Sequence, residues 1–274
     1  MDKAQPDLLS GQRSVILGLL LTLAAAAWAG LIWHSHTTTE MTMTHAVGHA
    51  RHFIADWLVM MVAMMLPTAV PMILTFHKVQ AANRQPRDAF ASAWVFVAAY
   101  LLMWAFAGLA AYVGMQAGEA AAARLALPPT TAAQIGGAII VVAGIYQLTP
   151  LKDACLSKCR EPLDFIVTSW RGGATSALEM GLLHGAYCLG CCWLLFVILF
   201  PLGIMMDVVA MAAVTLIILA EKTLPWPRLT PYATAGALVL YGALVITSPQ
   251  LLPTFHQDGG SPMPTEMPMV MPGK

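Results

Sequence analysis

Charged residues are scarce in this sequence of 274 residues, and that scarcity excludes most soluble folds. Lys and Arg number 14 and Asp and Glu number 14, so charged residues make up 10% of the chain and the formal net charge is zero. Soluble domains carry about 25% charged residues. Without a basic excess or a reader motif, no nucleic-acid partner is expected. With 58% hydrophobic residues, much of them in long runs, the composition is that of an integral membrane protein in a lipid bilayer.

Cysteine is also scarce, and its distribution is uneven. The chain has five cysteines, all between residues 155 and 192. An odd number confined to one segment does not fit the disulfide framework of a small secreted domain. Methionine, by contrast, is abundant, with 18 residues. Thiols in one segment together with many thioethers indicate metal or redox chemistry.

Seven apolar segments approach the roughly 17–25 residues that a helix needs to cross a bilayer. They predict an all-α, polytopic bundle with spans at about 14–33, 57–76, 89–113, 132–148, 176–200, 204–220 and 232–248. With the N-terminus inside and the C-terminus outside, eleven of the 14 Lys and Arg face the cytoplasm, as the positive-inside rule requires. The expected location is the bacterial inner membrane. The first span has an alternative interpretation as a signal peptide, but its length favours an uncleaved helix.

This topology divides the chain into four parts. They are a tail with the first helix (1–33), an external His/Met-rich loop (34–56), a six-helix domain (57–248) with a cytoplasmic loop at 149–175, and an external Met/Pro-rich tail (249–274) of disordered composition. The two external segments carry thioethers and imidazoles and are predicted to capture copper, with ordinary polar loops as the alternative. These ligands are His34, His36, Met41, Met43, His45, His49, His52, Met263, Met267, Met269 and Met271.

The segment His184–Trp193 carries one histidine and three cysteines within nine residues. His184, Cys188 and either Cys191 or Cys192 follow an i, i+4, i+7/i+8 spacing and therefore share a helix face. Ionisable groups at membrane depth are costly and usually functional. Thiolates and an imidazole in a dry site favour a soft metal ion, with Cu(I) first and Zn(II) or Ni(II) as alternatives.

The second span adds thioethers at a similar predicted depth. Met60 and Met64, and likewise Met61 and Met65, are i, i+4 pairs that share a face. If the second and fifth spans pack together, a mixed Met/Cys/His metal site forms between them. Packing alone is the simpler interpretation for any single methionine.

A further pair of thiols, Cys155 and Cys159, lies in the predicted cytoplasmic loop. A spacing of four residues suits a separate two-thiolate site for Cu(I) or Zn(II). The neighbouring cations Lys152, Lys158 and Arg160 are expected to lower the thiol pKa values and favour thiolate. The alternative is a basic loop with incidental cysteines. The dipeptide Glu221-Lys222, at the same predicted face, is expected to anchor the sixth span at the interface, with contact of Glu221 to an internal cavity as the alternative.

Three blocks together carry a family resemblance: Trp57–Pro67, Tyr146–Arg160 and His184–Trp193. Over about 50–225, the chain resembles a bacterial family of predicted metal-binding integral membrane proteins of unknown function, some of them copper-related. The resemblance implies functional positions at Met60, Met64, Met65, Cys155, Cys159, His184, Cys188, Cys191 and Cys192. The external loop and the tail lie outside the matching part.

The sequence therefore predicts a non-enzymatic membrane protein that binds Cu(I) and transports it, or delivers it from a periplasmic copper protein or to a membrane cuproenzyme. One alternative is a membrane thiol oxidoreductase that uses the C-x-x-C pair Cys188 and Cys191. Against it, no second cysteine pair lies on the outer side, where substrate proteins would be. The other alternative is an assembly subunit whose cysteines bind nothing.

Overall fold

The computed structural model describes residues 4–37, 50–83, 86–169, 175–202, 207–226 and 228–252, and in these ranges the chain forms helices and no strands. The predicted all-α class is thus confirmed. Six helices are long and apolar enough to cross a membrane, and they coincide with six of the seven predicted spans. They are α1 (Ala4–Thr37), α3 (Ala50–Asn83), α4 (Pro86–Arg124), α5 (Pro129–Tyr146), α8 (Ser176–Val197) and α10 (Leu229–Thr247).

The remaining predicted span, the sixth along the chain at 204–220, corresponds to α9 (Val208–Thr223), which has 16 residues. At 1.5 Å per residue it is about 24 Å long, shorter than the roughly 30 Å hydrocarbon core of a bilayer. Its N-terminus is capped by Asp207, whose carboxylate accepts from the backbone N–H of Ala210 at 2.7 Å. It ends at an extended Leu224, before Pro225.

The segment expected to be a cytoplasmic loop contains two short helices, α6 (Pro150–Arg160) and α7 (Pro162–Ser169). The start of α6 has a local cause. Thr149 supplies the cap, with its hydroxyl accepting from the backbone N–H of Lys152, and Pro150 occupies the first turn, where its missing N–H costs nothing. A short 3-10 turn, η1 (Pro249–Leu251), follows α10.

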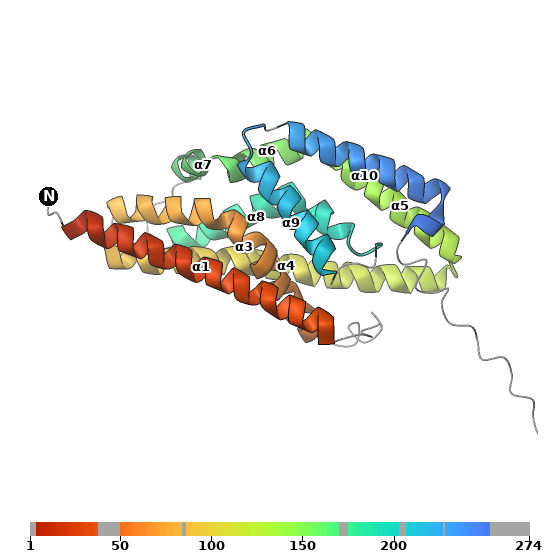
Figure 1. Ribbon diagram of the computed structural model, residues 1–274, viewed down its shortest axis with the longest axis horizontal. Coiled ribbons are helices and arrows are strands. Elements are labelled where there is room, and N and C mark those ends of the chain that lie inside the picture. Colours follow the sequence, from red (N-terminus) through yellow and green to blue (C-terminus); the bar gives the residue numbers. More distant parts are fainter. Residues whose placement is uncertain are drawn as a thin grey trace, which may run out of the picture.

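The helices form two groups (Figure 1). The helices α1, α3 and α4 run side by side, and α8 packs against α4; α5 and α10 form a pair at the other end of the molecule. Glycines allow the close approaches. A Cβ on Gly181 of α8 would lie 2.5 Å from the carbonyl oxygen of Phe96 in α4, and one on Gly242 of α10 would lie 2.7 Å from that of Gly137 in α5.

Two indoles, the half-buried one of Trp28 and the buried one of Trp57, link α3 to its neighbours. The Trp28 Nε1–H of α1 donates to the carbonyl of Ala63 at 3.0 Å, and the Trp57 Nε1–H of α3 donates to the carbonyl of Trp104 in α4 at 2.9 Å. The helix α3 is therefore held between α1 and α4, and most side chains of its middle turns are buried.

Candidate metal centre

The predicted ligand face of α8 points into the protein. His184, Cys188, Cys191 and Cys192 are each at most 2% exposed. All three thiols belong to free cysteines rather than disulfides. The helical spacing of His184 and Cys188 thus places an imidazole and a thiol one turn apart on a water-free face.

Cys188 is the hub of this face. Its sulfur lies 3.1 Å from the hydroxyl of Tyr100 in α4 and accepts from the ammonium Nζ of Lys222 in α9 at 3.1 Å. The thiols of Cys191 and Cys192 donate to the Cys188 carbonyl at 3.1 and 2.8 Å. Three helices therefore meet at a single sulfur atom.

The helix α6 brings further thiols to the same place. Cys159 is hydrogen-bonded to the sulfurs of Cys188 and Cys191. Cys155 lies against Gly190 of α8, where a Cβ would be 2.8 Å from its sulfur. We expected these two cysteines to form a separate site in a cytoplasmic loop. In the structure they line α8, because α6 is an amphipathic helix that packs on α8 rather than an exposed loop.

The expected electrostatic effect on these two thiols is wrong in sign. Hydrogen bonding to the sulfurs of Cys188 and Cys191, together with burial, raises the pKa of Cys159 well above its usual value. Burial and the nearby Cys191 sulfur raise the pKa of Cys155. The cations that we expected to lower these pKa values all have other partners.

Each of those three cations is bound elsewhere. Lys158 forms an exposed ion pair with Asp164 at 2.7 Å, and this hydrogen bond raises the pKa of its ammonium group. Arg160 donates to the carbonyls of Glu221 and Leu224 at the end of α9. Lys152, the third cation, is buried in an ion pair with α9.

The dipeptide Glu221-Lys222 is interior, so the expectation of an interfacial anchor is wrong. Glu221 is 1% exposed, and both of its carboxylate oxygens accept from the Lys152 Nζ, at 2.7 and 2.8 Å. Gln147 accepts from the same ammonium group. Lys222 points the other way, to Cys188. A charged pair closing a 16-residue apolar helix is the sequence signal that should have marked these residues as functional candidates.

His184 occupies an aromatic cage. Its ring lies between 5.5 and 5.8 Å from the rings of Phe96, Tyr100 and Phe165, measured between centroids. Neither ring nitrogen has a hydrogen-bond partner among the residues that the structure describes. A buried imidazole with both nitrogens unpaired is costly, and such an exception needs a ligand or another specific cause.

The predicted thioethers of α3 are also interior. Met60, Met61, Met64 and Met65 are each at most 1% exposed. Two anchors at the ends of this stretch reach α8. The Trp57 ring lies 6.1 Å from that of Phe196, and Thr68 accepts from Lys222, which also donates to Cys188.

These anchors fix the relation between the two helices. Met61 and Met64 share the face of α3 that carries both anchors. From Trp57 through these two methionines to Thr68 the steps are four, three and four residues, which is the spacing of one helix face. On α8, Cys192 lies halfway between the two anchored positions. The helices α3 and α8 both pack on α4. They meet each other through side chains such as Trp57 and Phe196. The methionines of α3 and the cysteines of α8 belong to one core cluster.

The thiols are gathered but not arranged around a single point. Among the described residues, no three Cys, His, Asp or Glu side chains are positioned to hold an ion as they stand. The cause is visible in the hydrogen bonds, because two of the thiols are turned back onto the Cys188 carbonyl. A metal ion would require rotation of these side chains about χ1 and replacement of thiol protons.

Residues 54–245 match the model of the PpoB2 family, which is described as a copper chaperone. The chain belongs to this copper chaperone family. No curated protein and no solved structure gave a match. The match agrees with the copper-related family that the sequence blocks resemble, and it covers the cysteines of α6 and α8 and the four methionines of α3.

The residues that we predict to capture copper are only partly described in the structure of this copper chaperone family member. His34 lies near the end of α1 and His52 near the start of α3. The others lie outside the described residues, at least in their side chains: His36, Met41, Met43, His45, His49, Met263, Met267, Met269 and Met271.

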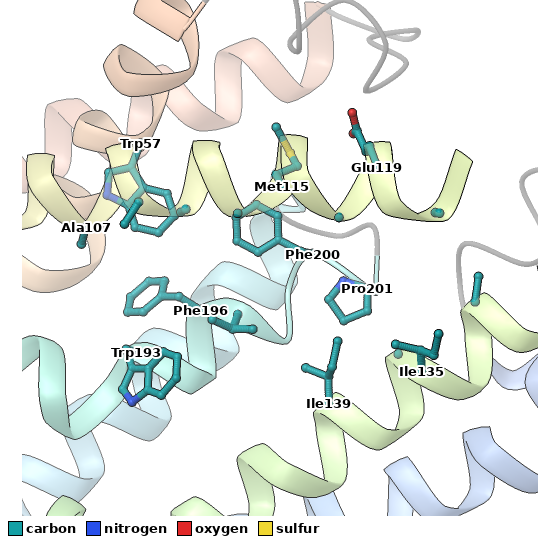
Figure 2. Close-up of a pocket in the computed structure, with 18 of the residues that line it drawn as sticks. Trp57, Ala107, Met115, Glu119, Ile135, Ile139, Trp193, Phe196, Phe200 and Pro201 are labelled. Atoms are coloured by element: carbon teal, nitrogen blue, oxygen red, sulfur yellow. The ribbon is translucent and has the colours of Figure 1, made fainter. Parts of the chain in front are cut away.

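The helix α8 also borders an apolar cavity of about 1130 Å³ that the sequence did not reveal. Figure 2 shows Trp193 and Phe196 of α8 at its edge, with Met115 on α4 and Ile139 on α5. Gly190 lines the cavity and also contacts Cys155. The cavity and the sulfur cluster are therefore separated only by α8.

Proposed function

We propose that this protein binds Cu(I) as cargo at the thiol cluster centred on Cys188, within the membrane. The observation that carries the proposal is the convergence of α6 and α8. Thiols that lie 29 or more residues apart in sequence, on Cys159 and on Cys188 and Cys191, are brought within hydrogen-bonding distance of each other. A structural role in packing does not require so many thiols at one place, and the family is one of copper chaperones.

The donor set favours Cu(I) over the alternatives. Thiolates and thioethers are soft ligands, and soft ligands select Cu(I). Zn(II) and Ni(II) would compete through thiolate and imidazole, but the buried methionines of α3 add nothing for them. The unpaired nitrogens of His184, one turn from Cys188, supply a further donor.

The role that we propose is transfer rather than catalysis. Copper captured outside, from a periplasmic copper protein or by the His/Met-rich segments, would enter the Met/Cys/His core and pass to a membrane cuproenzyme or across the membrane. The gathering of the Cys191, Cys188 and Cys159 thiols at one place supports exchange, since neighbouring thiols can take over an ion without releasing it to water.

The decisive experiment compares two purified proteins in detergent under anaerobic conditions. Wild type loaded with Cu(I) should retain at least one copper ion per chain. The variant with Cys188, Cys191 and Cys192 replaced by Ser should lose it, because Ser is a hard ligand of similar size. Met115→Leu, on the cavity side, is the matched control and should bind as wild type does.

Two outcomes would contradict the proposal. Full copper retention in the triple Ser variant would place the ion elsewhere. Wild type that stays metal-free, with disulfides among Cys159, Cys188 and Cys191, would favour the thiol oxidoreductase instead, because those sulfurs are already in contact.

A further inference from the structure

Lys222 is a buried cation whose two hydrogen-bond partners are a hydroxyl group and a cysteine sulfur. It is 8% exposed, and its Nζ donates to the hydroxyl of Thr68 at 3.0 Å and to the sulfur of Cys188 at 3.1 Å. Within the described ranges, no carboxylate lies within ion-pair distance of this ammonium group. The adjacent carboxylate of Glu221 is taken by Lys152.

A lone positive charge in such a place is expensive unless a negative charge forms beside it. The groups beside Lys222 are thiols, since it interacts electrostatically with Cys188, Cys159 and Cys191. Metal binding converts thiols to thiolates. The negative charge that matches Lys222 therefore arises when a metal ion is bound.

The charge of the bound complex depends on the ion. Two thiolates around Cu(I) carry a net charge of −1, and Lys222 brings the total to zero. The same two thiolates around Zn(II) are neutral, and Lys222 leaves an unmatched positive charge in a low-dielectric interior. The other nearby charges do not alter this difference, because Glu221 and Lys152 cancel and Arg160 lies on the carbonyls at the end of α9.

We propose that Lys222 is the specificity-determining counter-charge of the metal site, favouring a monovalent soft ion over a divalent one in a two-thiolate complex that includes Cys188. This inference rests on the proposed function, namely copper binding at the Cys188 cluster. It adds a residue of α9, outside the Cys/His/Met ligands, whose contribution is its charge.

Thr68 offers a way to test charge without removing Lys222. Replacing Thr68 by Asp places a carboxylate beside the ammonium group and cancels its charge. Replacing it by Asn adds a side chain of nearly the same shape as Asp but without the charge. The pair Thr68→Asp and Thr68→Asn complements the direct pair Lys222→Met and Lys222→Arg. The conclusion therefore does not depend on any single variant folding.

The experiment measures Cu(I) and Zn(II) affinities of purified protein at one pH, by competition with chromophoric chelators of each ion. Lys222→Met and Thr68→Asp should each lower the ratio of Cu(I) to Zn(II) affinity by about thirtyfold or more, which is the lower end for loss of one partner of a buried charge pair. Lys222→Arg and Thr68→Asn should keep the wild-type ratio. Lys158→Met, which removes an exposed lysine, is the control for any change of net charge.

The outcomes separate this inference from the proposed function. Equal losses of Cu(I) and Zn(II) affinity in the charge-changing variants would show that Lys222 is merely structural and overturn the inference. Affinities for both ions that stay at their wild-type values would overturn the inference as well, while leaving copper binding intact. Wild type that binds no Cu(I) would instead overturn the proposed function, and the inference with it.

Discussion

The two faces of α8 differ in both chemistry and packing. One face carries His184, Cys188 and Cys192, is closed to solvent, and is joined to α4, α6 and α9 by hydrogen bonds to sulfur. The other face carries Ala186, Leu189 and Trp193 and borders the apolar cavity (Figure 2). The difference teaches that the reactive groups are confined to the densely packed side, so the cavity side can change without altering the sulfur cluster.

The packed side also concentrates buried charge, and this makes it sensitive to substitution. Glu221 and Lys222 are adjacent in α9 yet face different partners, the one Lys152 of α6 and the other Cys188 of α8. The short helix α9 is thus held to both thiol-bearing helices through consecutive side chains. On the cavity side the links between helices are hydrogen bonds to backbone carbonyls, from Trp57 to Trp104 and from Tyr146 to Gly190.

The largest expected effect comes from breaking the buried ion pair. Glu221→Gln leaves the Lys152 ammonium buried without a counter-charge. Loss of one partner of a buried pair costs about 3–5 kcal/mol, so the free energy of unfolding should fall by that amount. Denaturant titration in detergent would measure it.

The exposed pair between α6 and α7 provides the control for this change. Asp164→Asn breaks the ion pair with Lys158. The Lys158 side chain is 31% exposed and that of Asp164 is 48% exposed, so the free energy of unfolding should fall by only about 0–1 kcal/mol. Equal effects of the two substitutions would mean that Lys152 and Glu221 are not held together in a dry interior.

A smaller loss should follow from separating α8 from α4. Gly181→Ala puts a Cβ 2.5 Å from the Phe96 carbonyl oxygen and 2.7 Å from the Cβ of Ala99, and neither group can rotate away. Overpacking of this kind costs about 1–3 kcal/mol. We expect reduced thermal stability and weaker Cu(I) binding, because Tyr100 of α4 would move away from Cys188. Unchanged stability would contradict the close helix contact.

The smallest effect, of opposite sign, is expected on the cavity side. Gly114 lines the cavity, and a Cβ there would meet nothing within 4 Å. Gly114→Ala should stabilise α4 by up to about 1 kcal/mol through helix propensity. Cu(I) stoichiometry should stay at the wild-type value. A loss of copper binding in this variant would show that the two faces of α8 are coupled after all.

Periodicity and hydropathy predicted the helical class and the ligand face of α8, because both depend on local sequence. The i, i+4 spacing of His184 and Cys188 is a property of any helix, so their common face follows directly. For the α3 methionines the spacing predicted only shared faces, and their burial comes from the structure. What periodicity does not encode is which helices meet.

Three features depended on such long-range contacts and were mistaken or missed. We expected Cys155 and Cys159 to form a separate site in a loop. The packing of α6 on α8, which the local sequence does not show, brings them to the cysteines of α8 instead. We expected Lys222 to anchor its helix at the membrane interface. Its partner Cys188 lies 34 residues earlier in the chain, so the local sequence does not reveal the contact. The cavity arises from three helices, α4, α5 and α8, whose spacing no single segment reveals.

The central claim is that thiols of α6 and α8 jointly hold Cu(I), and X-ray absorption at the copper edge tests it most directly. We predict that Cu(I)-loaded wild type shows a first shell dominated by sulfur, and that Cys159→Ser replaces one sulfur scatterer by a lighter atom or lowers the sulfur count. A first shell of nitrogen and oxygen alone would contradict the account. So would a sulfur shell that persists unchanged when both Cys159 and Cys188 are replaced by Ser.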